Sequence, residues 1–253
     1  MINLKDRAAI VGIGETGYTR GSGMSDLALM LQAAIRAIED AGLSPKDIDG
    51  IIPPFFGAPA EAFAVNLGIP DLRYATTVHL GGASPVASLQ SAAMAVATGV
   101  ARNVLSVTGW NGYSGFRLGT MRSEWAMPLP MGLVMRDFEN PFGNFVPVQW
   151  FALMARRHMH EYGTTGRQFG AVAVAMRKHA QLNDRAIMKK PMTIEDHQNS
   201  RMIADPFRLF DCCIESDGAA AVVVTSAERA GGMRHRPIYI MGVAAPSLSM
   251  QQS

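Results

Sequence analysis

The residues best suited to chemistry lie in one short segment between an expected strand and an expected helix. It reads His79-Leu80-Gly81-Gly82-Ala83-Ser84-Pro85. At such a junction the first backbone N–H groups of a helix point at whatever precedes them, which suits an anion or a carbonyl under attack. Ser84 does not fit the nucleophile motif G-x-S-x-G because position 86 is valine. We therefore expect Ser84 to cap the helix and Pro85 to occupy its first turn.

A second candidate group follows the next expected strand. Asn111, Tyr113 and Arg117 come directly after an apolar run at residues 103–109. Ligands of layered α/β proteins bind beyond the carboxyl ends of strands, and both groups have that position. Tyr113 is suited to donating a proton to an oxyanion, and Arg117 to binding a phosphate. The alternative for these two residues is a structural or dimer contact.

A glycine motif near the N-terminus looks like a dinucleotide site but lacks its context. Gly12-Ile13-Gly14-Glu15-Thr16-Gly17 matches G-x-G-x-x-G after an apolar run. A dinucleotide site needs the third glycine inside the following helix. Here residues 18–23 delay that helix, and the nearest acidic residues, Glu39 and Asp40, come at the helix end. We therefore expect no dinucleotide site.

Neither the histidines nor the cysteines form a recognisable site. His158 and His160 are two residues apart on one expected helix, so they face different sides and cannot share a metal. Cys212 and Cys213 are neighbours, which is too constrained for an ordinary disulfide. We expect both to be small buried hydrophobic residues, and we expect no metal site.

Composition restricts the class of protein. The chain has 253 residues, of which 48% are hydrophobic and 17% charged, so it is not a disordered chain. A net charge of +2 gives no support for nucleic-acid or membrane-surface binding. Two cysteines fit a reducing compartment, and the first residues do not resemble a secretory signal, so we expect a cytoplasmic protein. Residues 75–101 contain no Lys, Arg, Asp or Glu, which predicts a buried helix and not a membrane span.

Hydrophobic periodicity predicts alternating strands and helices, and therefore α/β layers around a mixed, mostly parallel sheet. A helix is expected between Ser25 as its cap and Gly42 at its end. Residues 112–147, rich in Gly, Pro, Met, Trp and Phe, are expected to form a loop excursion. Strands are predicted at 8–13, 48–52, 72–78, 103–109, 219–225 and 238–243, and later helices at 148–162, 167–181 and 226–231.

Five stretches resemble a known superfamily. Leu27–Gly50, which ends in AIEDAGLSPKDIDG, is similar to the first helix and second strand of the thiolase superfamily. Asp211–Ala221, continuing into VVVTSAERA, resembles the thiolase-like lipid-transfer proteins related to the thiolase part of sterol carrier protein X. Trp110–Gly115, Arg157–Gly163 and Asp196–Arg201 look most like the steroid side-chain-cleaving aldolases of that group.

The resemblance implies a fold and a division of the chain. It implies the N-terminal half of a layered α-β-α-β-α sandwich, so the chain looks truncated at its C-terminus. Residues 1–235 would form the N-terminal thiolase-like domain, and residues 236–253 would begin the second half. The family's catalytic His, its second acid–base Cys and the tyrosines of the aldolases belong to that half. A sheet built for such a sandwich would leave an apolar face bare, which predicts association.

The resemblance also implies a reaction. Aligning residues 82–85 with the Cys-Ala-Ser-Gly-like run of thiolases places Gly82 at the nucleophilic Cys, and glycine cannot hold an acyl group. A retro-aldol cleavage needs only a base for a β-hydroxyl and donors for an enolate oxygen. We therefore expect carbon–carbon cleavage of a β-hydroxyacyl-CoA with a steroid side chain or similar lipid. The alternatives are acetyl transfer with Cys212 or Cys213 as nucleophile, and acyl-CoA binding without catalysis.

Under the leading interpretation each candidate residue has a role. Tyr113 and His79 would be catalytic, with the other main catalytic residues in the second half of the fold. The substrate is a coenzyme A thioester, and no further cofactor is expected. The expected partners are a second copy of the chain and a small zinc-ribbon and OB-fold protein. The residues expected to bind substrate or CoA are Gly82, Ser84, Asn111 and Arg117.

Overall fold

The structure is a computed structural model that describes residues 4–117 and 135–244. The chain divides into two compact units. Unit 1 comprises Met1–Ser114 and Asp217–Ser253, and unit 2 comprises Gly115–Ser216. The expected domain boundary at residue 235 falls within unit 1 and remains a prediction. Residues 118–134 of the expected loop excursion, and the end of the expected second-half segment from residue 245 onward, lie outside the described part.

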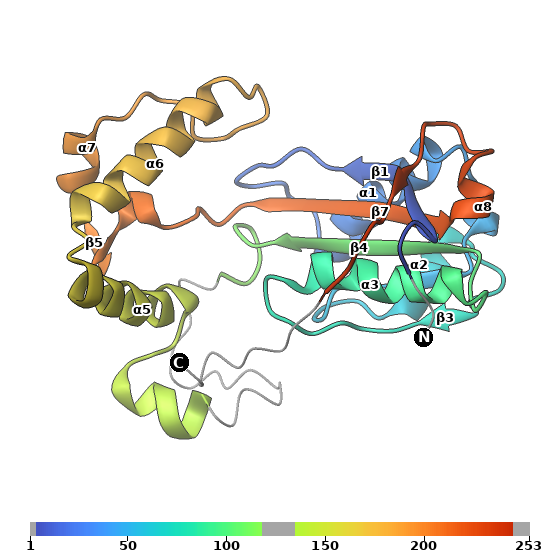
Figure 1. The fold of residues 1–253 in the computed structure, drawn as a ribbon, viewed down its shortest axis with the longest axis horizontal. Coiled ribbons are helices and arrows are strands. Elements are labelled where there is room, and N and C mark those ends of the chain that lie inside the picture. The colour runs from blue at the N-terminus through green and yellow to red at the C-terminus, as the bar shows by residue number, and fades with distance from the viewer. Residues whose placement is uncertain (1–3, 118–134, 245–253) are drawn as a thin grey trace. The chain divides into compact units, whose positions relative to one another are not determined.

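Unit 1 is built on a six-stranded sheet in the order β3-β2-β4-β7-β1-β8 (Figure 1). β2 pairs in parallel with β3 and β4, β7 lies antiparallel between β4 and β1, and β8 is antiparallel to β1. Strands β1 to β4 therefore run in one direction, which confirms the predicted mixed α/β sheet. The elements are β1 (Ala8–Glu15), α1 (Asp26–Asp40), β2 (Gly50–Ile52), α2 (Ala60–Leu67), β3 (Tyr74–Ala75), α3 (Ser84–Ala97), β4 (Asn103–Asn111), β7 (Asp217–Ser226), α8 (Ala227–Ala230) and β8 (Ile238–Tyr239).

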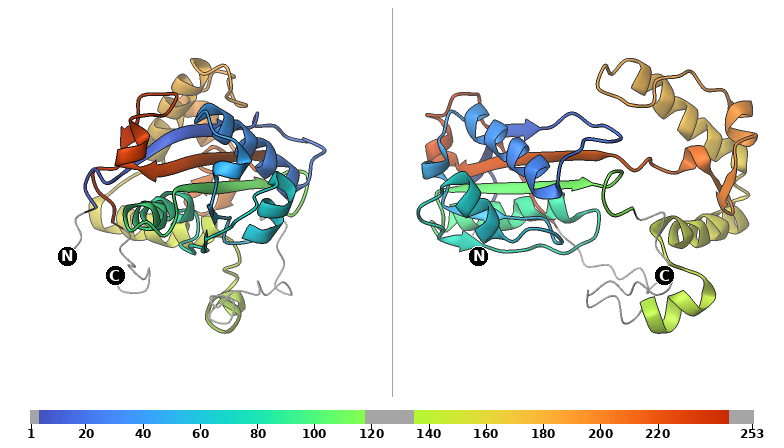
Figure 2. Two further views of the ribbon diagram at one scale, coloured as in Figure 1. Left: turned by 90° about the vertical axis from the view of Figure 1, so that its right-hand side faces the viewer. Right: turned by 180° about the vertical axis from the view of Figure 1, so that it is seen from behind.

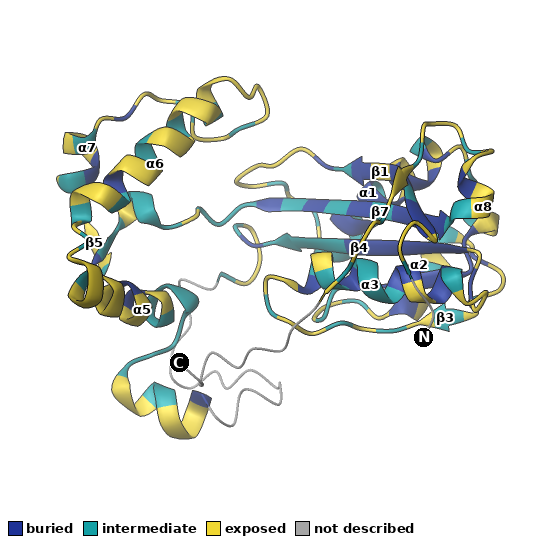
Figure 3. Cartoon of the chain, viewed as in Figure 1, coloured by how far each residue is buried: buried dark blue, intermediate teal, exposed yellow. Residues whose placement is uncertain are grey.

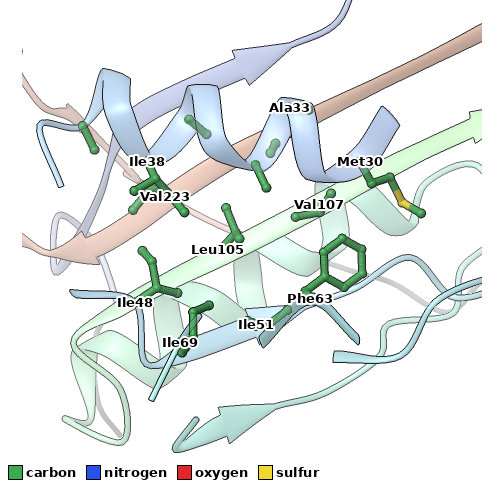
Figure 4. Packing of buried hydrophobic residues seen from close by; sticks show 14 of the residues in the cluster. Met30, Ala33, Ile38, Ile48, Ile51, Phe63, Ile69, Leu105, Val107 and Val223 are labelled. Carbon is green, nitrogen blue, oxygen red and sulfur yellow. The ribbon is translucent and has the colours of Figure 1, made fainter. Parts of the chain in front are cut away.

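Alternate residues of the central strands enter two hydrophobic clusters, one on each face of the sheet. Leu105 and Val223 pack with Met30 and Ile38 of α1 (Figure 4). The preceding and following residues, Val104 and Val224, belong to the cluster of α3. Since successive side chains of a strand point to opposite faces, α1 and α3 cover opposite faces (Figure 2). Unit 1 is therefore an α-β-α layered structure.

The glycine motif of β1 has a packing role. A Cβ atom at Gly12 would overlap the backbone oxygen of Ala37, and one at Gly14 would overlap that of Ala33. Both oxygens belong to α1, so the glycines allow this helix to lie against the strand. α1 itself begins as predicted, because the Ser25 side chain accepts a hydrogen bond from the backbone N–H of Ala28 at 3.2 Å.

Helix α3 differs from its prediction. Its lack of charged residues predicts burial on all sides. Ser88, Ala92 and Val96 are buried against the sheet, but Val86 is 74% and Met94 48% exposed. One face of the helix is thus apolar and open. The edge strands β3 and β8 are also shorter than predicted, since each has one neighbouring strand to pair with.

Unit 2 is mainly helical and much of its surface is exposed (Figure 3). Both predicted long helices form, whereas α7 and the small sheet of β5 and β6 were not predicted. His197 is buried and its Nε2 donates to Asp211 Oδ1 at 2.7 Å, and Asp205 pairs with Arg156. The described elements of unit 2 are η3 (Met135–Glu139), η4 (Asn140–Phe142), α5 (Pro147–Tyr162), α6 (Gly166–Gln181), α7 (Ile194–Gln198), β5 (Met202–Ala204), β6 (Phe207–Arg208) and η5 (Leu209–Asp211).

Within residues 4–117 and 135–244, no helix combines the length and the apolar character that crossing a membrane would require.

Candidate functional site

The junction between β3 and α3 is a self-contained turn. The N-cap of α3 is Ala83, so the expected cap, Ser84, is instead the first residue of the helix. The Ser84 hydroxyl accepts from the backbone N–H of Leu80 at 2.8 Å and donates to the carbonyl of Gly81 at 2.7 Å. The cap prediction was wrong because this hydroxyl closes the preceding loop. Pro85 does lie in the first turn, as predicted.

The turn also uses backbone groups that were expected to face a ligand. The N–H of Ala83 donates to the carbonyl of Leu80, and that of Ser84 donates to the carbonyl of Gly81, both at 3.1 Å. Gly82 has open space around it, since no described atom lies within 4 Å of the position of an added Cβ. Its φ is not in the left-handed region either. Neither space nor backbone conformation therefore requires glycine at this position.

A row of aromatic rings connects this junction with the end of β4. The His79 ring lies edge-on to Phe55 at 4.6 Å, Phe55 contacts Phe56 at 4.4 Å, and Phe56 contacts Trp110 at 5.5 Å. Phe55 and Phe56 follow β2, and Trp110 is the penultimate residue of β4. The row thus runs along the carboxyl ends of parallel strands, and Phe56 remains 40% exposed. It provides an accessible apolar surface beside the candidate residues.

The end of β4 is tied to the loop before α1. The backbone N–H of Asn111 donates to Asp26 Oδ1 at 2.7 Å, and its side-chain amide donates to the carbonyl of Met24 at 3.2 Å. Asn111 therefore fixes the loop that leads into α1. Its expected contact with substrate remains a prediction.

Tyr113 is held by a buried carboxylate that sequence reasoning missed. Asp217 is the first residue of β7 and is fully buried. Its Oδ1 accepts from the backbone N–H groups of Tyr113 at 2.9 Å and Ser114 at 3.0 Å. Its Oδ2 accepts from the Ser114 hydroxyl at 2.6 Å and from the backbone N–H of Ser22 at 2.7 Å. One carboxylate thus joins three segments of unit 1.

The hydrogen bonds around Asp217 keep it ionised. Burial by itself raises the pKa of this carboxyl, but the bonds from Ser114, Ser22 and Tyr113 outweigh burial and hold the pKa well below its usual range. The four donors are neutral groups that point at the two oxygens. The loop that contributes Ser22 also places the Arg20 guanidinium over the Tyr113 ring, 4.4 Å from its centre.

The remaining candidates lie in unit 2. Arg117 pairs with Glu215, with Nε 2.8 Å from Oε2, and its expected contact with CoA phosphates remains a prediction. Cys212 is half-buried and Cys213 is exposed, so the expectation of two buried residues was wrong. Burial raises the pKa of the Cys212 thiol, and the neighbouring Asp211 raises it further. A thiol that stays protonated is a weak nucleophile.

Some of the missed residues carried a signal in the sequence. Asp217 is a charged residue at the start of an apolar run, and Phe55-Phe56 is an aromatic pair directly after a predicted strand. Both features mark positions at strand ends. Arg20 and Ser114 carried no such signal, because their role depends on segments distant in sequence.

Two curated relatives align with nearly the whole chain. It is 46% identical over 243 residues to the 17-hydroxy-3-oxo-4-pregnene-20-carboxyl-CoA lyase of Mycobacterium tuberculosis, in an alignment that covers 95% of the chain and 63% of that protein. It is 44% identical over 246 residues to the steroid side-chain-cleaving aldolase of Thermomonospora curvata, with 96% of the chain and 63% of that protein covered. The chain thus spans slightly less than two thirds of the length of these relatives. No protein-family model matches the chain.

Solved structures show the same relationship. The structure of the Ltp2-ChsH2(DUF35) aldolase matches with a TM-score of 0.84 and 43% identity over 95% of this chain and 61% of that chain. A monomeric SCP2-thiolase like protein from Mycobacterium smegmatis shares the fold, with a TM-score of 0.65 and 21% identity over 92% of this chain and 48% of that chain.

The layered sheet and these alignments show a thiolase-like fold. The chain is a homologue of the steroid side-chain-cleaving aldolases.

Proposed function

We propose that the protein containing this chain is a lyase that cleaves a carbon–carbon bond of a β-hydroxyacyl-CoA by a retro-aldol reaction. The similarity over 95% of the chain to a protein named as a CoA-thioester lyase carries the proposal. The similarity to a steroid side-chain-cleaving aldolase supports it.

The reaction needs a base, a donor and no covalent enzyme intermediate. The base removes the proton of the β-hydroxyl, the bond between Cα and Cβ breaks, and Cβ becomes a ketone. The electron pair passes to Cα and onto the thioester oxygen, and protonation of Cα releases a shorter acyl-CoA. In the proposed site Tyr113 donates a hydrogen bond or proton to the enolate, with His79 as the second candidate.

The environment of Gly82 supports this chemistry over acyl transfer. Acyl transfer of the thiolase type needs a thiolate at this junction. Among the described residues the space around Gly82 would admit a cysteine, so packing against them does not impose the lack of a nucleophile there. Burial and the neighbouring Asp211 raise the pKa of the Cys212 thiol, so it is a poor substitute.

The aromatic row supports a bulky acyl group. Phe55, Phe56, His79 and Trp110 place ring surfaces beside the junction, where the apolar part of a substrate would be desolvated. We therefore propose a fused-ring acyl group of the steroid type. We also propose that the protein acts together with a small partner protein, since the name of the Ltp2-ChsH2(DUF35) aldolase includes a second component. The homodimer is proposed from the resemblance alone.

The direct test uses two substrates that differ by one hydroxyl. The full protein encoded with this chain, with and without its partner, is incubated with 17-hydroxy-3-oxo-4-pregnene-20-carboxyl-CoA and with the same thioester lacking the 17-hydroxyl. We expect mass spectrometry to show a ketone and a shorter acyl-CoA from the hydroxylated substrate alone. Binding without product, with the partner present, would favour the non-catalytic interpretation and overturn the proposal.

Replacing Phe56 by alanine tests the acyl contact. We expect KM for the steroid thioester to rise about tenfold, since an exposed ring contact of this size is worth about 1.4 kcal/mol. KM for a short β-hydroxyacyl-CoA should stay unchanged. Phe142→Ala is the control, because Phe142 is likewise an exposed phenylalanine and is not part of the aromatic row. Equal changes for both substrates would argue against the contact.

A further inference from the structure

We propose that Asp217 is a positioning residue that fixes Tyr113 for the reaction. The inference deepens the proposed function and rests on it, because it assigns to Tyr113 the role of donor. It also goes beyond that function, since it concerns a carboxylate with no direct contact to substrate. The observation that supports it is that three segments of the chain meet at one fully buried side chain.

Asp217 controls the backbone of Tyr113 directly. Its Oδ1 receives the N–H groups of Tyr113 and of the next residue, Ser114, so it fixes the peptide plane on both sides of Tyr113. The hydroxyl of Ser114 closes onto Oδ2 at 2.6 Å. A short turn held by three donors from two consecutive residues has little freedom to rotate.

Asp217 also controls what lies over the Tyr113 ring. Its Oδ2 accepts from the N–H of Ser22, and its own backbone pairs with Thr19 through bonds of 2.7 and 3.1 Å. Arg20 lies between these two anchors and places its guanidinium over the ring. The same carboxylate therefore sets both the tyrosine and the cation that packs on it.

The asparagine variant breaks this arrangement with little change of shape. An amide has one acceptor oxygen, and its NH2 group would face donors on the other side. Depending on the orientation of the amide, its NH2 group would face one of two pairs of donors. These are the N–H groups of Tyr113 and Ser114, or the Ser22 N–H and the Ser114 hydroxyl. Tyr113 would shift while the strand pairing of β7 remains available.

Asp49 is a matched control at the other end of β4. It is 1% exposed, and its Oδ1 likewise accepts two successive backbone N–H groups, those of Arg102 at 2.8 Å and Asn103 at 2.9 Å. Its Oδ2 also pairs with the Arg102 guanidinium at 3.1 Å. Asp49→Asn is thus the same chemical change at another buried anchor, remote from the end of β4 that carries Tyr113.

The experiment is a double-mutant cycle on the full protein with its partner, measured by ketone release. We expect Tyr113→Phe to lower kcat about 100-fold. We expect Asp217→Asn to lower kcat about tenfold with KM within about threefold, and to lower it no further in the Tyr113→Phe background. Asp49→Asn should leave kcat unchanged. Ser114→Ala, which removes one donor and keeps the rest, should lower kcat about threefold.

Other outcomes overturn the inference. Equal losses from Asp217→Asn in both backgrounds, or an equal loss from Asp49→Asn, would show general damage and not positioning. If Tyr113→Phe keeps full activity, Tyr113 is not the donor and Asp217 has no catalytic group to position, while the lyase proposal stands. If the wild type releases no ketone, the proposed function fails. The NMR signal of the Tyr113 ring, assigned by its loss in Tyr113→Phe, then decides whether Asp217 positions this ring. It should shift in Asp217→Asn and stay in place in Asp49→Asn; an unmoved signal in Asp217→Asn contradicts positioning.

Discussion

The region from β1 to α1 and the region from β3 to α3 each combine glycines with a serine near the start of a helix, but their surroundings differ. Gly12 and Gly14 belong to β1 itself, whereas Gly81 and Gly82 belong to the loop after β3. In the first, Gly12 and Gly14 lie against the backbone of α1, and Ser25 caps the helix. In the second, Gly82 meets no described atom and Ser84 closes a loop. The meaning of a glycine is thus set by what packs over it.

The loop of the first junction is anchored by a buried carboxylate, although its residues 17–21 are exposed, whereas the second junction borders the aromatic row. Asp217 ties the loop between β1 and α1 to the end of β4, so the first junction serves as a rigid support. The second has exposed residues, including His79 and Gly82, beside the aromatic row. A site needs both properties, a support that fixes the donor and an opening that admits the substrate.

The largest contrast between the junctions should come from Gly14→Ala. The added Cβ would overlap the backbone of α1, which cannot move away without separating the helix from the sheet. We expect the free energy of unfolding to fall by at least about 3 kcal/mol, measured by urea denaturation of the full protein. A loss below about 0.5 kcal/mol would mean that α1 does not pack on β1 as described.

A smaller effect, dependent on pH, should come from the support around Asp217. Its folded-state pKa lies below the ordinary value of 3.8, so its stabilising contribution is complete well above that value. This contribution is lost as the pH falls below 3.8, because the carboxyl group is protonated in the unfolded state before it is protonated in the folded state. We expect Asp217→Asn to cost about 2 kcal/mol at pH 7.

The difference between wild type and Asp217→Asn should therefore shrink as the pH is lowered from about 5 toward 3, measured by urea denaturation at each pH. A difference that stays constant over this range would show that the carboxylate charge does not contribute. A difference that grows would contradict the direction of the pKa shift.

Sequence patterns predicted the elements that bury apolar residues. The runs at 8–13 and 219–225 became the paired strands β1 and β7, because a central strand with apolar side chains on both faces has few alternatives. The edge strands were overestimated, since the length of an edge depends on its one neighbour. The open face of α3 was missed because periodicity reports apolarity and not what covers it.

Strand ends indicated where a candidate site would lie, but the sequence did not indicate the contacts of its residues. Strand ends indicated His79 and Tyr113, and the structure connects their neighbourhoods through Phe55, Phe56 and Trp110. The role of Asp217 depends on donors about 100 and 200 residues away in sequence, which no local pattern contains. Ser84 was misjudged for a different, local reason, because its hydroxyl bonds to Leu80 and Gly81 of the preceding loop and not to the helix that it was expected to cap.

The smallest effect should come from Gly82→Ala, and it sharpens the contrast with Gly14. The position has room for a Cβ and an ordinary backbone conformation, so the free energy of unfolding should change by less than about 0.5 kcal/mol. Ketone release should persist, because the retro-aldol route uses no side chain at this position. Replacing both Cys212 and Cys213 by alanine should likewise leave activity unchanged, since burial raises the pKa of the Cys212 thiol. Loss of activity in that variant, with Gly82→Ala still folded, would instead favour a cysteine nucleophile and acyl transfer.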